Sequence, residues 1–368
     1  MKITIICTRS RSILWYRQKL VEKWQELGHE VSVIALDDEC KNEIEALGLD
    51  FYCMNDANRS LNPFKILTLK NRYAKLIKKI NPDLVFTFML KPNIYGVQGA
   101  KKAGVKKIYS MVEGAGDVFI HNSLKWKIIR FVVSRGYKKS FKISKKVFFL
   151  NDDDKNEFIE RGIIDKNHCE RINGIGVDLE RFEFTPIKNK QTFLMVARLT
   201  PTKGVYEYCE ASKIVKERFP SASFKLLGGE GLITKADIEK YTSDGTVEYL
   251  GYTNDVVPYM IDASVNVLPS YREGLSTVNV EASAIGRPTI TCDANGMRST
   301  VVDGQTGFLV SVRDAQAVAD KMMYFLENPD KLEEMGKNAR IFAEENFDQR
   351  KINEHICNII FGNEDICQ

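Results

Sequence analysis

The chain has 368 residues, of which 44% are hydrophobic and 28% charged, with a formal net charge of +4. This length predicts about two domains, and a charge so close to neutral does not require a nucleic-acid partner. No apolar run approaches the ~20 residues of a membrane-spanning helix. Eight cysteines without a Cys-x-x-Cys pair, and a start (MKITIIC) too short for a signal peptide, indicate reduced thiols in a cytoplasmic protein. Four scattered histidines predict no metal cluster.

The first part of the chain alternates short apolar strands with amphipathic helices. We expect strands at 2–7, 30–36, 50–54, 83–88 and 106–111, and helices at 13–27, 40–47, 63–80 and 93–103. This alternation is typical of a parallel sheet covered on both faces, as in a doubly wound, Rossmann-like α/β domain. No Gly-x-Gly-x-x-Gly follows the first strand, so the usual dinucleotide fingerprint is absent.

Three loops of this domain are candidates for ligand binding, because ligands of doubly wound sheets bind at the carboxyl ends of the strands. They span 8–13, 91–95 and 113–117. The third, EGAGD, combines glycines that allow close backbone approach with two acids suited to sugar hydroxyls or a reacting centre. The alternative is a plain tight turn with solvated acids.

A basic stretch follows these loops. Between Val118 and Asn151 there are nine Lys or Arg and no acid, interleaved with aromatic and aliphatic residues. Such a segment, taken as 124–146, suits the surface of an anionic membrane. A helix that faces the core and keeps its basic face in solvent is the alternative. Nucleic acid is a weaker candidate, because no binding motif accompanies the stretch.

A strand is expected at 147–150, and the three acids at 152–154 follow it. They resemble a metal-binding cluster, but we favour a helix cap, because Asn and Asp are preferred before and within the first turn of a helix, here 155–161. A glycine-punctuated turn at 172–182 and a polar stretch at 183–191 then mark a linker. We therefore predict one domain over 1–187 and a second over 188–346.

The second domain opens with a strand that ends near Arg198, followed by Lys203-Gly204 and a helix at 205–219. An Arg fork and a Lys point charge are the two cation types that hold a diphosphate. Later elements are expected in this order: strand 224–227 leading into GGEG, strand and short helix within 247–260, strand 263–268, helix from Ser276, strands 288–293 and 304–310, and helices 314–327, 329–346 and 348–361.

The segment from Leu268 to Pro288 predicts a strand, a turn and a helix N-terminus, a geometry that binds anions through free amides and the helix dipole. Gly274 allows close approach, and Ser276 and Thr277 offer hydroxyls. Glu281, further inside the helix, would repel the same anion and is better suited to a polyol such as ribose. The pattern indicates a ligand with both phosphate and hydroxyls, although such units also occur by chance in α/β proteins.

Arg198 and Lys203, followed by Glu273-x7-Glu281 with GGEG and LGYTNDV between them, resemble the signature of glycosyltransferase family four, the retaining GT-B enzymes. The resemblance extends over nearly the whole chain. KPNIYG at 91–96 and EGAG at 113–116 further resemble a bacterial subgroup that extends lipid-linked oligosaccharides. The resemblance implies a GT-B fold, in which two Rossmann-like domains face each other across a cleft and the C-terminal helix, 347–368, packs back towards the first domain.

The resemblance also implies residue roles. Arg198 and Lys203 would hold the donor diphosphate, Glu273 would face the donor sugar, and Glu113 would stand on the acceptor side where many family members have a His. The catalytic candidates are thus Glu113, Arg198, Lys203 and Glu273. The donor-binding candidates are Gly228, Gly229, Thr253, Val256, Gly274, Leu275, Ser276, Thr277 and Glu281. The acceptor-side candidates are Arg9, Ser10, Lys91, Asn93, Gly114 and Gly116.

The function implied is the retaining transfer of a hexose or N-acetylhexosamine from a UDP-sugar to a polyprenyl-diphosphate-linked glycan, in lipopolysaccharide, capsule or glycoprotein synthesis. GDP and ADP donors stay open. Cations and helix-end amides would stabilise the leaving diphosphate without a metal. The enzyme would be peripheral on the inner face of the cytoplasmic membrane. The alternatives are another GT-B enzyme, such as a nucleotide-sugar epimerase, and a non-catalytic glycan-binding relative.

Overall fold

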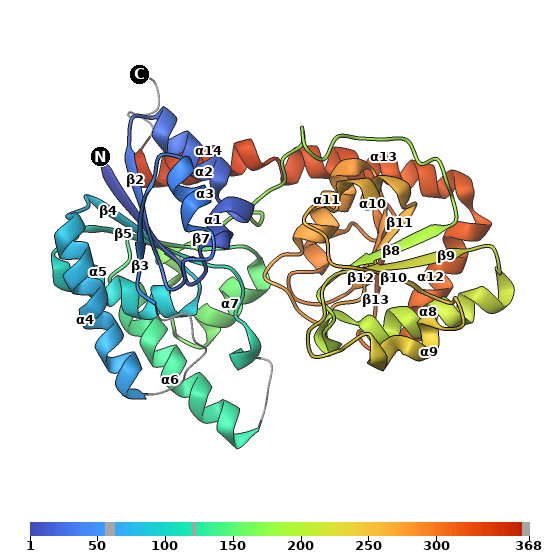
Figure 1. Ribbon diagram of the computed structural model, residues 1–368, viewed down its shortest axis with the longest axis horizontal. Helices are drawn as coiled ribbons and strands as arrows, with labels where there is room; N and C mark the ends of the chain where they lie inside the picture. The colour runs from blue at the N-terminus through green and yellow to red at the C-terminus, as the bar shows by residue number, and fades with distance from the viewer. Residues whose placement is uncertain (56–62, 120–122, 363–368) are drawn as a thin grey trace. The chain divides into compact units, whose positions relative to one another are not determined.

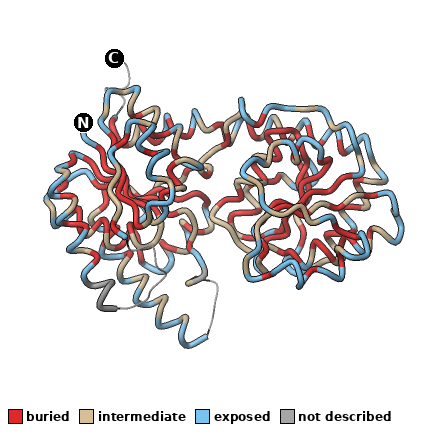
Figure 2. The backbone as a smooth tube through the Cα atoms, in the orientation of Figure 1, coloured by how far each residue is buried: buried red, intermediate tan, exposed pale blue. Residues whose placement is uncertain are grey.

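The computed structural model describes residues 1–55, 63–119 and 123–362, except the side chains of 63–67 and 117. Contacts divide the chain into two compact units (Figure 1). The first contains residues 1–175 and the chain from Arg350 onward, and the second contains residues 176–349. Each unit has a parallel sheet whose central strands are buried (Figure 2). Among the described residues, no helix is both long and apolar enough to cross a membrane.

The first unit is built on a seven-stranded sheet in the order β3-β2-β1-β4-β5-β6-β7, with every pairing parallel. Its strands are β1 Lys2–Ile6, β2 Glu30–Ala35, β3 Asp50–Cys53, β4 Leu84–Phe88, β5 Lys107–Val112, β6 Lys146–Phe149 and β7 Cys169–Arg171. The short β7 was not anticipated from the sequence. All five residues of β4 are buried, as expected for a central strand with helices on both faces.

The helices of this unit lie on the two faces of the sheet (Figure 1). They are α1 Arg11–Tyr16, α2 Gln18–Glu26, α3 Lys41–Ala46, α4 Pro63–Ile80, the π-turn Pro92–Gly96, α5 Val97–Ala103, α6 Leu124–Phe141, α7 Asp152–Glu160 and α14 Gln349–Phe361, with 3-10 turns at Asp117–Phe119 and Lys166–His168. The sequence predicts one helix over 13–27. The structure has two, because the backbone of Arg17 (φ −132°, ψ −2°) leaves the helical region between α1 and α2.

The last helix completes the core of the first unit. Trp24 on α2 is fully buried. Its ring centroid lies 5.7 Å from that of Phe86 on β4 and 6.3 Å from that of Phe361 on α14. The Tyr109 hydroxyl donates a hydrogen bond to the carbonyl of Ile360 (3.3 Å). These contacts join the chain after Arg350 to strands formed by the first half of the sequence.

The second unit has a six-stranded parallel sheet in the order β10-β9-β8-β11-β12-β13. Its strands are β8 Thr192–Val196, β9 Ser223–Leu227, β10 Glu248–Gly251, β11 Val265–Leu268, β12 Thr289–Cys292 and β13 Gly307–Val310. Its helices are α8 Val205–Arg218, α9 Glu239–Thr242, α10 Val257–Asp262, α11 Thr277–Ile285, α12 Ala315–Glu327 and α13 Pro329–Asn346, with 3-10 turns at Pro201–Lys203, Ala236–Ile238 and Arg298–Thr300.

The polar linker belongs to the second unit, so contacts divide the chain at 175/176, whereas the sequence predicts a boundary at 187/188. A buried side chain that sequence reasoning did not single out helps to hold the linker in this unit. Arg287 is 1% exposed, and it donates hydrogen bonds to the carbonyls of Thr185 (2.6 Å) and Ala263 (2.6 Å). It also donates to the carbonyl of Ile261 (2.8 Å). Burial lowers the pKa of its guanidinium to about 10.

Replacing this arginine tests its role in the second unit. Arg287→Met leaves several buried carbonyl oxygens without a hydrogen-bond donor. We therefore expect a loss of about 3 kcal/mol in the free energy of unfolding of this unit. Urea unfolding followed by circular dichroism measures it. The control is Arg218→Met, which removes an exposed ion pair with Glu327 and should cost less than about 0.5 kcal/mol. Equal losses in the two variants would contradict the assignment.

Candidate functional site

Two strand-to-helix turns of the second unit are hydrogen-bonded to each other at the carboxyl edge of its sheet. The turn after β8 crosses the turn after β11 in close contact, and a Cβ on Gly204 would collide with the carbonyl oxygen of Pro269. Gly204 also has φ +77°, a conformation that other residues avoid. Tyr271 N donates to the carbonyl of Thr202 at 2.9 Å, and Ser270 Oγ lies 3.1 Å from the same oxygen.

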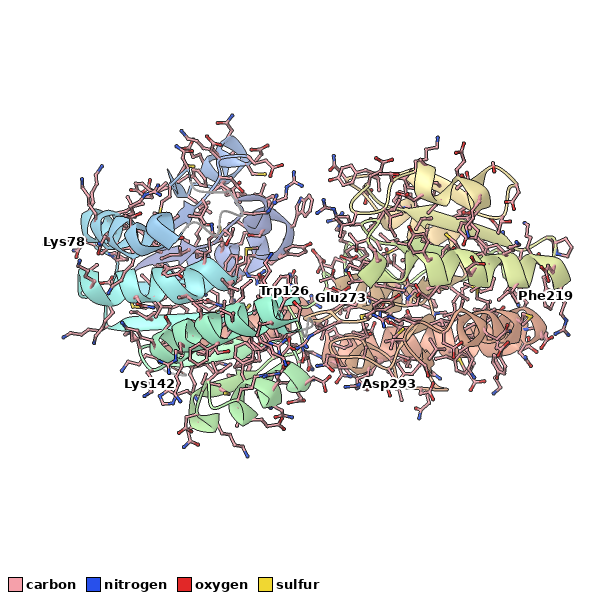
Figure 3. The ribbon with its side chains drawn as sticks, turned by 90° about the horizontal axis from the view of Figure 1, so that it is seen from below. Lys78, Trp126, Lys142, Phe219, Glu273 and Asp293 are labelled. Carbon is pink, nitrogen blue, oxygen red and sulfur yellow. The ribbon has the colours of Figure 1, made fainter. Side chains whose placement is uncertain are left out.

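This crossing brings together two predicted catalytic side chains. The ammonium of Lys203 forms an ion pair with Oε1 of Glu273, which is labelled in Figure 3. Ser270 Oγ lies 2.9 Å from the same carboxylate oxygen, so its single proton can be donated either to Glu273 or to the carbonyl of Thr202. Both side chains are partly exposed, so the pair can exchange partners with a ligand at modest cost.

The helix that follows presents free amide groups. Ser276 is the N-cap of α11, and its hydroxyl accepts the amide of Asn279 at 3.3 Å. The Ser276 amide donates to the carbonyl of Gly296, so the amide of this predicted donor-binding residue is occupied, while its hydroxyl keeps a proton to donate. Within the described chain, the amides of Leu275 and Thr277 make no hydrogen bond, and they remain available for an anion at the positive end of the helix dipole.

A loop that sequence reasoning missed supports this turn. Residues 293–297 follow β12, and the Asn295 carbonyl accepts the amide of Glu273 at 3.0 Å. Together with the bond from Ser276 to Gly296, this fixes both ends of the 273–276 turn. The signal in the sequence was the glycine-containing stretch DANGM directly after a predicted strand, at the same edge of the sheet.

The predicted cation Arg198 lies beside the glycine turn that follows β9. Arg198 is exposed, and within the described chain it makes no ion pair. The Leu199 amide donates to the carbonyl of Gly229 (3.0 Å), and a Cβ on Gly228 would collide with the carbonyl oxygen of Ala197. Only glycine lets the two strand ends approach so closely. The Arg198 guanidinium, exposed beside them, is available for an anionic ligand.

The remaining donor-binding candidates lie on the same unit. Thr253 Oγ1 accepts the amide of Asp255 at 3.1 Å, and Val256 is the N-cap residue of α10. Glu281 lies on α11, four residues beyond Thr277, and is partly buried. Burial raises the pKa of its carboxyl from 4.5 to about 7, against the opposing attraction of Arg181. Hydrogen-bond donors from a ligand would stabilise the charged form of this carboxyl and lower its pKa again.

In the first unit, the predicted acceptor-side acid is tied to a buried arginine. Glu113 directly follows β5 and forms an ion pair with Arg17, which is 2% exposed. The Arg17 guanidinium also donates to Sδ of Met111 (3.1 Å) and lies 4.3 Å from the ring centroid of Phe88. Arg17 was not predicted from the sequence, because only the fold brings the α1–α2 break next to the end of β5.

The glycine turn after Glu113 is held by one of the three consecutive acids. The amide of Ala115, between Gly114 and Gly116, donates to Oδ2 of Asp154 at 3.0 Å. Asn151 accepts the amide of Asp154 (2.7 Å) as N-cap of α7, so these acids lie in a helix first turn, which begins earlier than the predicted residue 155. Among the described residues, no group of three or more His, Cys, Asp or Glu could hold a metal ion.

The other acceptor-side candidates divide into exposed and buried side chains. Arg9 is exposed and Lys91 is partly exposed. Ser10 is buried, and its amide (2.9 Å) and hydroxyl (2.5 Å) both donate to Asp37. Asn93 is also buried, and it donates to the carbonyl of Met111 at 2.7 Å. As they stand, Ser10 and Asn93 shape the loops rather than present free polar groups.

Two family models match the two units. The model described as "Glycosyl transferase 4-like" matches residues 6–146, and "Glycosyl transferases group 1" matches 177–342. The chain belongs to glycosyltransferase family four. This confirms the resemblance stated from the sequence and the assignment as a transferase.

Among full-length relatives, the transferase is similar to an N,N'-diacetylbacillosaminyl-diphospho-undecaprenol alpha-1,3-N-acetylgalactosaminyltransferase of Campylobacter jejuni. The two are 28% identical over 92% of this chain and 93% of the relative. A UDP-Gal:alpha-D-GlcNAc-diphosphoundecaprenol alpha-1,3-galactosyltransferase of Escherichia coli is 29% identical over 72% of each chain. The transferase therefore groups with bacterial enzymes for lipid-linked glycans.

Solved structures agree on the fold. HepE of Anabaena, crystallised with UDP-glucose, superposes with a TM-score of 0.78 at 19% identity, over 97% of this chain and 98% of HepE. A glycosyltransferase of Rickettsia africae superposes with a TM-score of 0.76 at 21% identity, over 98% and 99%. The predicted fold, two Rossmann-like parallel-sheet domains of the GT-B class, is confirmed.

The pKa of Glu281 gives a pH-dependent stability with a defined sign. An acid whose pKa rises on folding binds more protons in the folded than in the unfolded state between pH 4.5 and 7, so its contribution to stability declines as pH rises through this window. We expect the free energy of unfolding of wild type, minus that of Glu281→Gln, to fall from pH 5 to pH 7.5 and then level off. Chemical denaturation across this range measures it, and a constant difference would contradict the shift.

Proposed function

We propose that the transferase moves a hexose or N-acetylhexosamine from a UDP-sugar to a hydroxyl of a polyprenyl-diphosphate-linked glycan, with retention of configuration. One observation carries the proposal. Lys203, Glu273 and the free amides of Leu275 and Thr277 meet at one sheet edge, where two crossing turns offer positive charge beside a carboxylate. A diphosphate attached to a sugar has matching chemistry.

The names of relatives support the choice of substrates. The Campylobacter and Escherichia enzymes are named for undecaprenyl-diphosphate-linked acceptors, the latter also for UDP-Gal, and HepE binds UDP-glucose. Both enzyme names specify an alpha linkage. Transfer from an α-linked UDP-hexose to an alpha product retains configuration, which supports a retaining reaction here.

In the proposed reaction, donor binding rearranges one ion pair. The diphosphate attracts Lys203 away from Glu273, and Arg198 adds a second cation that has no competing ion pair in the described chain. As the glycosidic bond breaks, negative charge grows on the diphosphate, and cations and amides already in position stabilise it without reorganisation. Glu273, released from Lys203, accepts hydrogen bonds from hydroxyls of the transferred sugar.

Glu281 is assigned to the ribose. Hydrogen bonds from two hydroxyls favour the carboxylate over the protonated acid, so nucleotide binding should release the proton that burial helps to retain. Gly228, Gly229, Thr253 and Val256 are assigned to the base. On the acceptor side, Glu113 orients the attacking hydroxyl and accepts its proton.

A transfer assay tests the proposal. Incubation with UDP-linked glucose, galactose and their N-acetylamino forms, and a lipid-diphosphate glycan, should give UDP and an elongated lipid. Lys203→Met should lower kcat about 100-fold or more, since one cation at the leaving group contributes on this order. The matched control is Lys331→Met, which removes an ion-paired lysine on α13 and should leave kcat unchanged.

Each other result has a defined meaning. No turnover with any nucleotide sugar would reject the proposed reaction. Interconversion of donors without acceptor, with solvent hydrogen entering the sugar, would identify an epimerase instead. Equal rates for wild type and Lys203→Met would remove this lysine from the site.

We further propose that α6 attaches the transferase to the inner face of the cytoplasmic membrane. Trp126 and Lys142 lie near the two ends of this helix (Figure 3). Leu124, Ile128, Phe131 and Val132, spaced along one face, are each more than half exposed. The same helix and its C-cap residue also carry exposed lysines and one exposed arginine, at positions 125, 127, 135, 138, 139 and 142. An exposed apolar stripe with flanking cations fits an anionic bilayer better than a helix that faces the core.

Charge-neutralising variants test this attachment. Replacing Lys138, Lys139 and Lys142 with Gln should weaken binding to vesicles with anionic lipid about 100-fold, at ~1 kcal/mol per lysine, without changing UDP-sugar binding. The control replaces three exposed lysines of α4, Lys75, Lys78 and Lys79, with Gln. Vesicle flotation measures binding, and equal losses in both triple variants would mean that net charge alone matters.

A further inference from the structure

The turn that carries Glu273 begins near a tyrosine whose hydroxyl is held by a second glutamate. Tyr271 is half-buried, and its hydroxyl donates a hydrogen bond to Oε1 of Glu207 at 2.5 Å. Glu207 lies in the first turn of α8, four residues after Lys203, and Tyr271 lies two residues before Glu273. The two turns that are joined by the Lys203–Glu273 ion pair are therefore joined a second time, through side chains that the proposed reaction does not use.

The Glu207 carboxylate depends on this tyrosine. Within the described chain, the Tyr271 hydroxyl is its one hydrogen-bond donor, and the other carboxylate oxygen, Oε2, is buried without a partner. The first turn of a helix favours a carboxylate, but a buried carboxylate oxygen without a donor is costly. An apolar pair would serve packing alone better, so the contact indicates a need for a directional bond at this place.

The direction of the bond is fixed by the proton on the tyrosine. Burial, and then the hydrogen bond to Glu207, raises the pKa of Tyr271 to about 12, against the opposing effect of Arg313. The hydroxyl therefore keeps its proton at neutral pH and donates it to the carboxylate, which can only accept.

A third loop supports the tyrosine ring. Arg313 follows β13, and its guanidinium carbon lies 5.1 Å from the ring centroid of Tyr271, a cation–π distance. The backbone of Arg313 has φ +61°, a left-handed conformation that residues with a Cβ adopt at a cost. Such strain persists where surrounding contacts hold it, and it gathers near functional sites. Here the contact is with the tyrosine of the proposed donor turn.

Donor binding in the proposed reaction weakens the crossing of the two turns. Lys203 leaves Glu273 for the diphosphate, and an ion pair that joins the turns is then lost. The amide of Tyr271 still donates to the carbonyl of Thr202, and its hydroxyl still donates to Glu207. The hydroxyl bond reaches a 14-residue helix, so it ties the turn to a rigid element rather than to another loop.

We propose that Tyr271 and Glu207 are a positioning pair, which holds the 270–276 turn against α8 while Lys203 exchanges Glu273 for the donor diphosphate. Glu273 then stays in place for the transferred sugar. Neither member of the pair contacts the substrate, and both act through Glu273. The inference rests on the proposed function, which supplies the diphosphate, and neither residue is among the site residues predicted from the sequence.

Steady-state transfer kinetics, expressed per folded molecule, test the pair. Tyr271→Phe removes only the hydroxyl, so we expect kcat to fall about tenfold, the effect of losing a hydrogen bond to a charged group, with the acceptor KM unchanged. Glu207→Gln keeps an oxygen that accepts from the hydroxyl and should retain most of kcat, whereas Glu207→Leu should resemble Tyr271→Phe. A wild-type kcat in Tyr271→Phe would overturn the proposal.

The matched control is a second tyrosine–glutamate hydrogen bond on the same helix. Tyr241, on α9, donates to Glu210 on α8, and in the part of the chain that the structure describes neither side chain bonds to the 270–276 turn. Tyr241→Phe should lower stability and leave kcat per folded molecule unchanged. Equal losses of kcat in Tyr241→Phe and Tyr271→Phe would mean that any loosening of α8 slows the enzyme, and the positioning role would fail.

A double-mutant cycle asks whether the two residues act as one unit. If they do, Tyr271→Phe combined with Glu207→Leu loses no more kcat than the larger of the two single losses. If the two losses multiply instead, the residues act independently and the pair is wrong.

Amide hydrogen exchange separates this inference from the proposed reaction, because it needs no substrate. In Tyr271→Phe, the amides of 270–276 should exchange about tenfold faster than in wild type, while those of α12 keep their rates. If this is seen but wild type turns over no nucleotide sugar, the pair holds the turn and the fault lies with the proposed reaction. Unchanged exchange in the turn would overturn the pair, whatever the enzyme transfers.

Discussion

The ion pair between Lys203 and Glu273 depends on a close backbone crossing, and the proposed donor site depends on that ion pair. Gly204 allows the turn after β8 to pass the carbonyl of Pro269, and the crossing places a lysine from one turn against a glutamate from the next. Without ligand, each charge satisfies the other. A diphosphate sugar offers a partner to each, an anion for the lysine and hydroxyls for the glutamate. Both side chains therefore have a partner before and after the sugar binds.

The candidate residues of both units follow the same rule. In each parallel sheet, polar side chains gather where the strands end, and glycines bring backbone close to them. The second unit presents cations and free amides, which suit phosphate. The first unit presents a carboxylate held by a buried arginine, which suits hydroxyls. The proposed division of work between donor and acceptor follows from the chemistry at these two edges.

The sequence predicted the order of strands and helices well, because buried strands and amphipathic helices leave clear periodic patterns. It also predicted Arg198, Lys203 and Glu273 as site residues from strand-to-helix turns, and the structure brings Lys203 and Glu273 together as an ion pair. It did not identify Arg17, Arg287 or the 293–297 loop, since their roles arise from residues tens to about a hundred positions away. The same limit explains Ser10 and Asn93: their loops were predicted, but only tertiary contacts show that their polar groups are already occupied.

The final helix has a consequence for how the protein is made. Trp24 acquires its ring contact with Phe361 only after residue 361 has left the ribosome. During synthesis the second unit, which is contiguous from 176 to 349, has all its residues before the first unit has its own. The nascent first unit therefore waits with an uncovered tryptophan, and chaperones that bind apolar surface have their longest opportunity there.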